Sequence, residues 1–406
     1  DVQLIIDMPQ FWLVVIVASI IWQLILFSDA TILLKSIRRL YQITPQQLRT
    51  WAIYCIVSVL YISFALVFMP PLDIVEHSDS RYYLELAKNI GVISIFDWDA
   101  TRPPITPIIY SLFDEHVGLI PILQLSSQVI SWLLFAWTIA YLMTTQILRL
   151  LAALIILGFS LSVTVFHWWN VLLTESLTLS IMVLTITIII WFVKYLGNQP
   201  QPAWQQIILG TDLLVVVGIW LFLRDINFYA VIVLNTIILA LMLFNRLLRQ
   251  RMRIFLALII VGSLILAFFQ NHLSVENKHW KYPLTNVIVQ RILPNQLARN
   301  FFIINGLPIS DELLIAKSAI DISMNINNLD TFDNWLNTQG RHVYISYLLN
   351  HPIASILEPF YQRDALLLID DDLRGYSQIS EVHPIQAILT NLLAIHGSHL
   401  YGLSFG

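Results

Sequence analysis

Long apolar segments recur along most of this chain and limit what it can fold into. A helix needs about 20 mostly apolar residues to cross the hydrocarbon core of a bilayer. Eight segments come close to that length: 11–27, 51–71, 118–144, 150–166, 176–194, 206–222, 228–245 and 254–270. The charged residues amount to 12% of the chain, against roughly 25% in soluble domains. We therefore expect an all-α polytopic membrane protein.

The basic residues of the short loops indicate how the predicted helices cross the membrane. Loops on the cytoplasmic side carry an excess of Lys and Arg. If the N-terminus is outside, the inner loops hold Lys35, Arg38, Arg39, Arg49, Arg149, Lys194, Arg246, Arg249, Arg251 and Arg253. We expect a multi-pass protein of the plasma (inner) membrane, with its N-terminus and its C-terminal segment on the external, periplasmic side.

Two long segments project from the predicted transmembrane bundle, 1–270. The first is an external loop, 72–117, and the second is an external segment, 271–406, long enough to pack as a small domain. No polar tail precedes Gly406, so we expect the natural chain to continue. The first loop contains apolar residues at helical spacing, which predict one face of a helix lying along the membrane surface: Tyr83, Leu86, Ala87, Ile90 and Ile93.

Charge and cysteine content narrow the range of partners. The formal net charge is -4, which gives no reason to expect a nucleic-acid partner. The single cysteine, Cys55, lies in an apolar segment. It cannot form a disulfide or a thiolate metal site within one chain. Membrane lipids are the partners that this composition favours.

A polar run between two apolar segments holds the first candidate for chemistry: Glu76-His77-Ser78-Asp79-Ser80-Arg81-Tyr82-Tyr83. A carboxylate beside the membrane can act as a general base if it reaches an acceptor hydroxyl. Asp79 is therefore the candidate catalytic base. Arg81 would hold Asp79 ionised or bind a phosphate, and Tyr82 and Tyr83 are further site candidates. The alternative is a solvated loop acid in a surface ion pair.

Two arginines next to predicted spans are candidates for binding a lipid phosphate. Arg102 precedes two prolines just before a span, and Arg224 lies in the short turn between the sixth and seventh spans. A guanidinium group binds a phosphate with two parallel hydrogen bonds. For Arg224, an ion pair with its neighbour Asp225 is the alternative.

Polar residues next to other predicted spans extend the list of candidates. His167 and Glu175 lie between the fourth and fifth spans, where Glu175 either takes part in the site or caps the following helix. A basic cluster follows the eighth span and could bind a lipid phosphate, although ordinary snorkelling and solvation is the favoured explanation: Lys278, Lys281 and Arg291.

The order of these motifs over about residues 50–270 resembles the GT-C membrane glycosyltransferases. The closest branch is the group that uses polyprenyl- or dolichyl-phosphate sugars, including protein O-mannosyltransferases and the aminoarabinose transferase of lipid A. Four segments carry the resemblance: Asp79-Ser80-Arg81-Tyr82-Tyr83-Leu84-Glu85-Leu86-Ala87, Arg102-Pro103-Pro104-Ile105-Thr106-Pro107, Leu173-Thr174-Glu175-Ser176-Leu177 and Leu223-Arg224. Many members have Asp-Glu in the first loop, whereas Ser80 follows Asp79 here, so a second acidic role is unassigned.

The resemblance implies a glycosyltransferase that acts at the outer membrane face. The donor would be a polyprenyl-phosphate sugar, and the acceptor a hydroxyl of a lipid, a glycan or a protein. Asp79 would deprotonate the acceptor, which attacks the anomeric carbon with inversion, while the basic residues neutralise the leaving phosphate. A nucleotide is not needed. No metal ligands are assigned, although a divalent ion could assist.

Three other functions remain open from the sequence. A lipid-linked polysaccharide transporter or flippase would use the same basic surface without a base. An oligosaccharide polymerase or ligase would transfer whole glycans from a lipid diphosphate. A structural subunit of a larger membrane complex would use the long external segment as its interface.

Overall fold

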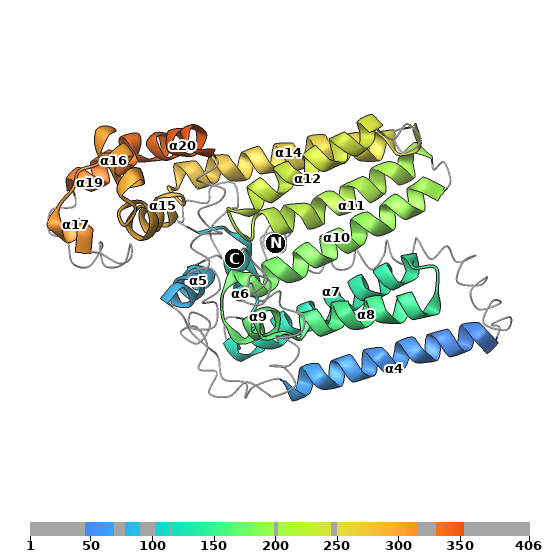
Figure 1. Cartoon of the computed structure of the whole chain (residues 1–406). Coiled ribbons are helices and arrows are strands. Elements are labelled where there is room, and N and C mark those ends of the chain that lie inside the picture. Colours follow the sequence, from blue (N-terminus) through green and yellow to red (C-terminus); the bar gives the residue numbers. More distant parts are fainter. Residues whose placement is uncertain are drawn as a thin grey trace, which may run out of the picture. The chain divides into compact units, whose positions relative to one another are not determined.

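The protein is described by a computed structural model, which covers residues 45–68, 78–89, 102–113, 116–198, 202–244, 250–315 and 330–352. These residues are mainly helical and include no β-strand (Figure 1). They separate into two compact units with a boundary between Asn271 and His272. Each unit is described by itself below. The predicted span 11–27 lies outside the described residues.

The first unit contains the long apolar helices of a multi-pass membrane protein. Five helical segments are long and apolar enough to cross a membrane. They are Val117–Leu142, which includes α7 (Ile120–Leu142), Thr174–Lys194 of α10 (Thr174–Asn198), α11 (Ala203–Leu221), α12 (Asn227–Phe244) and α14 (Arg253–Glu276). Of α14, the residues up to Asn271 belong to the first unit. The expectation of an all-α polytopic membrane protein is thus confirmed.

Two of the predicted spans correspond to shorter apolar helices. Ala52–Val67 belongs to α4 (Pro45–Val67), and α8 covers Gln146–Ser160. The predicted segment 150–166 is wrong as a single helix, because α8 ends at Ser160 and a separate α9 covers Val163–Phe166. At this break Ser160 Oγ donates to Leu157 O and Ser162 Oγ donates to Phe159 O. Serine side chains that bond to nearby carbonyls favour such bends.

Small side chains allow the helices of the first unit to approach closely. α7 packs against α8 and α10, and α10 packs against α11. Between α11 and α14, a Cβ added at Gly210 would lie 2.5 Å from Leu258 Cδ2, and one added at Gly262 would lie 2.5 Å from Leu214 Cδ1. Glycine at both positions lets the helices interdigitate, as is common for helices packed in membranes.

The short elements of the first unit gather at one end of the long helices. α10 begins at Thr174 and runs antiparallel to α11, which ends at Leu221, so the loops 171–173 and 222–226 lie at the same end. α5 (Ser78–Asn89), α6 (Ile105–Ser111) and the 3-10 segment His167–Asn170 occupy this end in Figure 1. We call it the loop end of the first unit.

The amphipathic face predicted in the first external loop is part of the protein core. Tyr83 and Ala87, on α5, are 5% and 6% exposed and pack in a cluster with Tyr110, Ile120 and Leu172. The apolar side chains of α5 therefore contact protein, and the predicted contact of that face with the membrane surface is corrected for Tyr83 and Ala87. Ile90 and Ile93 lie outside the described residues.

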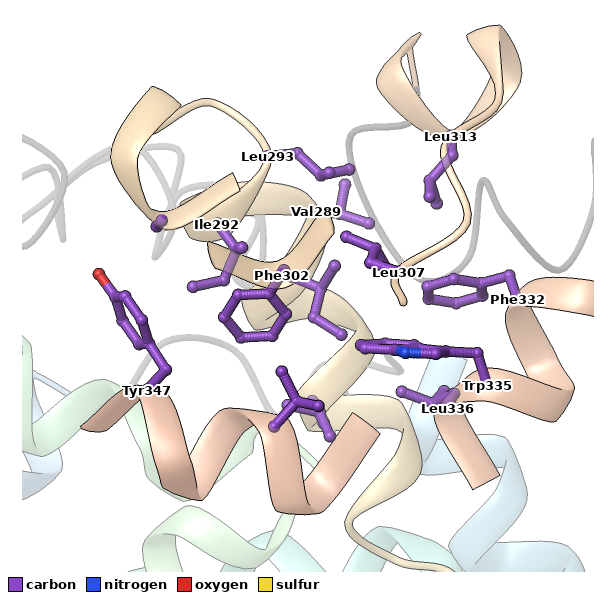
Figure 2. Close-up of a cluster of buried hydrophobic side chains, with 14 residues drawn as sticks. Val289, Ile292, Leu293, Phe302, Leu307, Leu313, Phe332, Trp335, Leu336 and Tyr347 are labelled. Carbon is purple, nitrogen blue, oxygen red and sulfur yellow. The ribbon is translucent and has the colours of Figure 1, made fainter. Parts of the chain in front are cut away.

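The second unit is a set of short helices around an aromatic core. Phe302, Phe332, Trp335 and Tyr347 are the buried aromatic side chains of this core, and Figure 2 shows them together with aliphatic neighbours. Its helices are α15 (Lys281–Val287), α16 (Gln296–Ile304), α17 (Asp311–Ile315), α19 (Asp330–Trp335) and α20 (Arg341–Asn350), with π-helical segments at Ile288–Ile292 and Leu336–Gly340.

Candidate functional site

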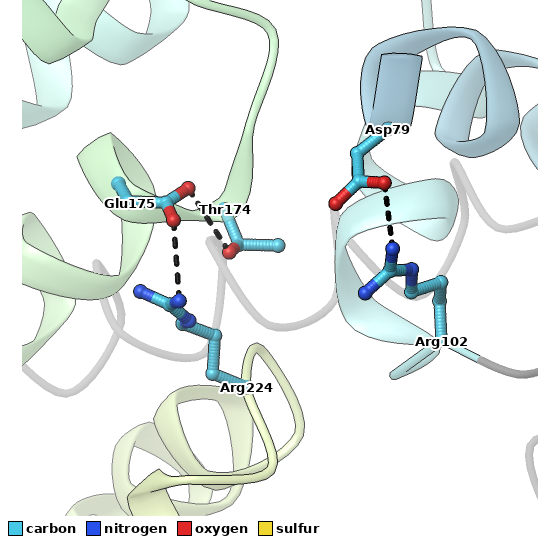
Figure 3. Close-up of polar contacts among 5 residues, drawn as sticks. All are labelled: Asp79, Arg102, Thr174, Glu175 and Arg224. Carbon is cyan, nitrogen blue, oxygen red and sulfur yellow. Dashed lines mark hydrogen bonds and ion pairs between the residues drawn. The ribbon is translucent and has the colours of Figure 1, made fainter. Parts of the chain in front are cut away.

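Two ion pairs lie at the loop end of the first unit (Figure 3). In the first, Arg102 Nη2 lies 2.6 Å from Asp79 Oδ1. Asp79 is in the first turn of α5, and Arg102 directly precedes the two buried prolines that lead into α6. The partner of Asp79 is thus Arg102, and Arg81 is exposed on the same helix as Asp79.

The second ion pair joins α10 to the turn between α11 and α12. Arg224 Nη2 lies 3.2 Å from Glu175 Oε1, and the hydroxyl of Thr174 lies 3.4 Å from Glu175 Oε2. Glu175 occupies the first turn of α10, where the helix dipole favours an acid. The alternative of an Arg224–Asp225 pair is not what the structure shows, because Asp225 Oδ1 accepts from Gln270 Nε2 at 2.7 Å.

Hydrogen bonds connect the segments that carry three of these four charges, those of Arg102, Glu175 and Arg224. The amide of Ile105, three residues after Arg102, donates to Phe222 O at 3.4 Å. The Tyr110 hydroxyl, at the end of α6, donates to Leu173 O at 3.2 Å and accepts from Gln124 Nε2 at 3.1 Å. These bonds connect α6 to both loops of the loop end, so the positions of Arg102, Glu175 and Arg224 depend on one another.

Tyr83 is electrostatically connected to both ion pairs. Its ring is buried and meets Tyr110 edge to face, with 6.5 Å between the centroids, and Arg102 Cζ lies 6.0 Å from its centroid. Burial raises the pKa of Tyr83 to about 12, and the charges of Arg102, Glu175, Asp79 and Arg224 all act on it. The side chain of Tyr83 is therefore a neutral phenol among four charges.

The four charged side chains remain open to a ligand. Arg102 is 26% exposed and Asp79 38% exposed, while Arg224 is 42% and Glu175 24% exposed. Ion pairs of this partly exposed kind stabilise a fold by only about 0–1 kcal/mol. An anionic ligand can compete with the carboxylates for these arginines, and a carboxylate released in this way can accept a proton.

Two other predicted residues of the first unit, Tyr82 and His167, lie on elements of the loop end. Tyr82 is half-buried on α5. His167 belongs to the 3-10 segment His167–Asn170, and its side chain lies outside the described residues. Of its neighbours, Trp169 is fully buried in the core that includes Trp132 and Phe166.

The predicted basic cluster belongs to the second unit, and two of its members have structural roles there. Lys281 Nζ lies 2.6 Å from Asp333 Oδ1, which joins α15 to α19. Lys278 adopts a φ of 55° where α14 ends, and the amides of Lys278 and His279 bond to Val275 O and Ser274 O. This is the double hydrogen bond of a Schellman helix ending. Arg291 is exposed on the segment Ile288–Ile292.

Sequence reasoning overlooked Gln124 and Tyr110. Gln124 is fully buried in α7 and bonds to both Tyr110 Oη and Leu173 O. A signal was available, since an amide inside an apolar segment is costly unless it is hydrogen-bonded. Tyr110 carried no such signal, because an isolated tyrosine near a span is normally an interfacial residue.

Comparisons with known proteins do not assign this site. Models of protein families, curated proteins and solved structures were all compared with the chain, and none of them matches it. Within the described residues, no group of three or more His, Cys, Asp or Glu side chains is arranged to hold a metal ion. The geometry of the two ion pairs is thus the basis for any functional conclusion.

Proposed function

We propose that the protein is a membrane glycosyltransferase that moves a sugar from a polyprenyl-phosphate donor to an acceptor hydroxyl, with Asp79 as the general base. One observation carries the proposal: two carboxylates and two arginines meet at one end of an apolar helix bundle, around the buried Tyr83. A base and a phosphate-binding group are the two parts that this reaction needs. The order of motifs that resembles the GT-C glycosyltransferases supports the same conclusion.

Each charged residue has a distinct part in the proposed reaction. Asp79 takes the proton of the acceptor hydroxyl, whose oxygen forms a bond to the anomeric carbon. The bond from that carbon to the phosphate oxygen breaks, and its electron pair remains on the phosphate. Arg224 and Arg102 neutralise the leaving phosphate, and attack from the opposite side inverts the anomeric centre.

The resting ion pairs impose a condition on donor binding. Both arginines are paired with a carboxylate before the donor arrives. A phosphate that takes Arg102 from Asp79 also releases the carboxylate that has to act as base. We expect the site to lie on the external face of the plasma (inner) membrane, where the lipid chain of the donor can remain in the bilayer.

The proposal is tested by incubating the purified protein with a panel of radiolabelled polyprenyl-phosphate sugars and a membrane extract as acceptor. We expect one free polyprenyl phosphate for each sugar transferred, and a product whose anomeric configuration is opposite to that of the donor. Turnover of a diphosphate-linked oligosaccharide instead would indicate a polymerase or ligase. Movement of the lipid across vesicles without a new glycosidic bond would indicate a transporter, and no turnover of any donor would overturn the proposal.

A further inference from the structure

Tyr83 has no role in the proton transfer proposed above, yet it occupies the centre of the site. It is 5% exposed, and its electrostatic partners are the two acids and the two arginines of the ion pairs. Its position on α5, four residues after Asp79, places both side chains on the same face of one helix turn. Tyr83 therefore belongs to the site and is more than a residue of the surrounding core.

The hydroxyl group of Tyr83 differs from that of the adjacent Tyr110. The Tyr110 hydroxyl is fully used, since it donates to Leu173 O and accepts from Gln124 Nε2. The interactions of Tyr83 with other described residues are ring contacts and electrostatic ones, without a hydrogen bond from its hydroxyl. The ring of Tyr83 is buried, but its hydroxyl oxygen is not one of the fully buried unpaired polar atoms of the described residues. A ligand can therefore reach this hydroxyl and supply its hydrogen-bond partner.

We propose that the Tyr83 hydroxyl donates a hydrogen bond to a phosphate oxygen of the donor, next to the two arginines. This inference rests on the proposed function and names a further residue that binds the donor. The edge of the ring is fixed against Tyr110 and the guanidinium of Arg102 lies near the ring, so the hydroxyl is held in place before the ligand binds. Tyr83 adds a neutral donor where both arginines already have carboxylate partners.

A neutral donor is suited to this position for an electrostatic reason. A third cation would bind the carboxylates of Asp79 and Glu175 as well as the phosphate, whereas a phenol adds a directed hydrogen bond without adding charge. The raised pKa of Tyr83 means that the hydroxyl keeps its proton at physiological pH. The hydroxyl can therefore donate a hydrogen bond to the phosphate of the intact donor and to the phosphate that leaves.

The test compares two probes that share a lipid chain, farnesyl phosphate and farnesol, on wild-type protein and Tyr83→Phe in detergent. Binding is followed by intrinsic tryptophan fluorescence. We expect Tyr83→Phe to weaken farnesyl phosphate binding by about 10- to 100-fold, as for a lost hydrogen bond to a charged group, and to leave farnesol binding unchanged. Tyr141→Phe is the matched control, because Tyr141 lies at the other end of α7 and removal of its hydroxyl keeps the ring that contacts Lys194.

The outcomes separate this inference from the function on which it rests. Equal farnesyl phosphate affinity in wild type and Tyr83→Phe would overturn the role of Tyr83 and leave the proposed function standing. An equal loss of both probes would also overturn it, since the hydroxyl would then support packing. If wild-type protein binds farnesyl phosphate no better than farnesol, the phosphate site itself is refuted, and both proposals fail together.

Discussion

The loop end of the first unit and the aromatic core of the second unit use the same kind of ion pair in different settings. At the loop end, Asp79–Arg102 and Glu175–Arg224 lie around a buried tyrosine, and all four charges act on it. In the second unit, Lys281–Asp333 lies beside a core built from Phe302, Trp335 and Tyr347. The comparison indicates that the residues around an ion pair, more than the distance between its charged atoms, distinguish a candidate functional site from a pair that only joins two helices.

The largest expected effect is on activity, from the substitution Asp79→Asn. Asparagine keeps a hydrogen-bonding oxygen for Arg102 but cannot accept the acceptor's proton. We expect transfer to fall by about 10²- to 10⁴-fold, the usual contribution of a general base, with little change in thermal unfolding. The measurement is kcat/KM with a saturating acceptor, on protein whose helix content matches wild type.

A control on the same helix isolates the role of Asp79. Glu85→Gln removes one acid from the exposed side of α5 and should leave the rate of transfer unchanged. Full activity of Asp79→Asn would remove Asp79 from the role of base. It would also indicate that the Asp79–Arg102 pair has only a structural role, as we expect for Lys281–Asp333 in the second unit.

The second effect is on stability, from Phe302→Ala in the second unit. Phe302 is fully buried among Trp335, Phe301 and Tyr347. Truncation of a buried phenylalanine costs about 3–5 kcal/mol, so we expect amide hydrogen exchange to accelerate in α16, α19 and α20. Leu297→Ala is the matched control, because Leu297 is on the same helix and is 83% exposed. Equal exchange in the two variants would contradict the packed core.

The third prediction concerns the second ion pair of the loop end. Arg224→Ala should raise the donor KM or lower kcat. We expect kcat/KM to fall by about 10²- to 10³-fold, because removal of one group that stabilises developing charge lowers the rate by about that factor. Arg224→Lys should recover part of the loss. Arg253→Ala, an exposed arginine at the start of α14, serves as the control for loss of one positive charge. Wild-type kinetics in Arg224→Ala would show that its pair with Glu175 only holds the loop.

The lengths of the apolar segments were enough to predict the long helices of the first unit, apart from the break after Ser160, but the partners within the site required the tertiary structure. The sequence suggested Arg81 as the ion-pair partner of Asp79, and Asp225 as the partner of Arg224, because these residues are neighbours in the chain. Residues two apart on a helix do not face each other, so Arg81 on α5 is directed away from Asp79. The true partners, 23 and 49 positions apart in the chain, meet only when α6, α10 and the turn after α11 come together.

The smallest expected effect comes from Lys281→Met, which tests whether the pair of the second unit is structural. Lys281 and Asp333 are 33% and 41% exposed, and pairs of this exposure contribute about 0–1 kcal/mol. We expect hydrogen exchange in α15 and α19 to increase only slightly, and the effect to shrink at high salt because ions screen exposed charges. Asp333→Asn should behave in the same way, since it breaks the same pair from the other side.

Donor kinetics of the same two variants decide between the two interpretations of Lys281. A structural pair predicts that Lys281→Met and Asp333→Asn have the same donor KM as wild type. A lysine that binds the donor phosphate, as the basic cluster suggested, predicts a higher KM in Lys281→Met, and an unchanged or lower KM in Asp333→Asn, which frees the lysine. A higher donor KM in Lys281→Met without a rise in Asp333→Asn would therefore assign Lys281 to phosphate binding, and would remove the contrast between the two regions.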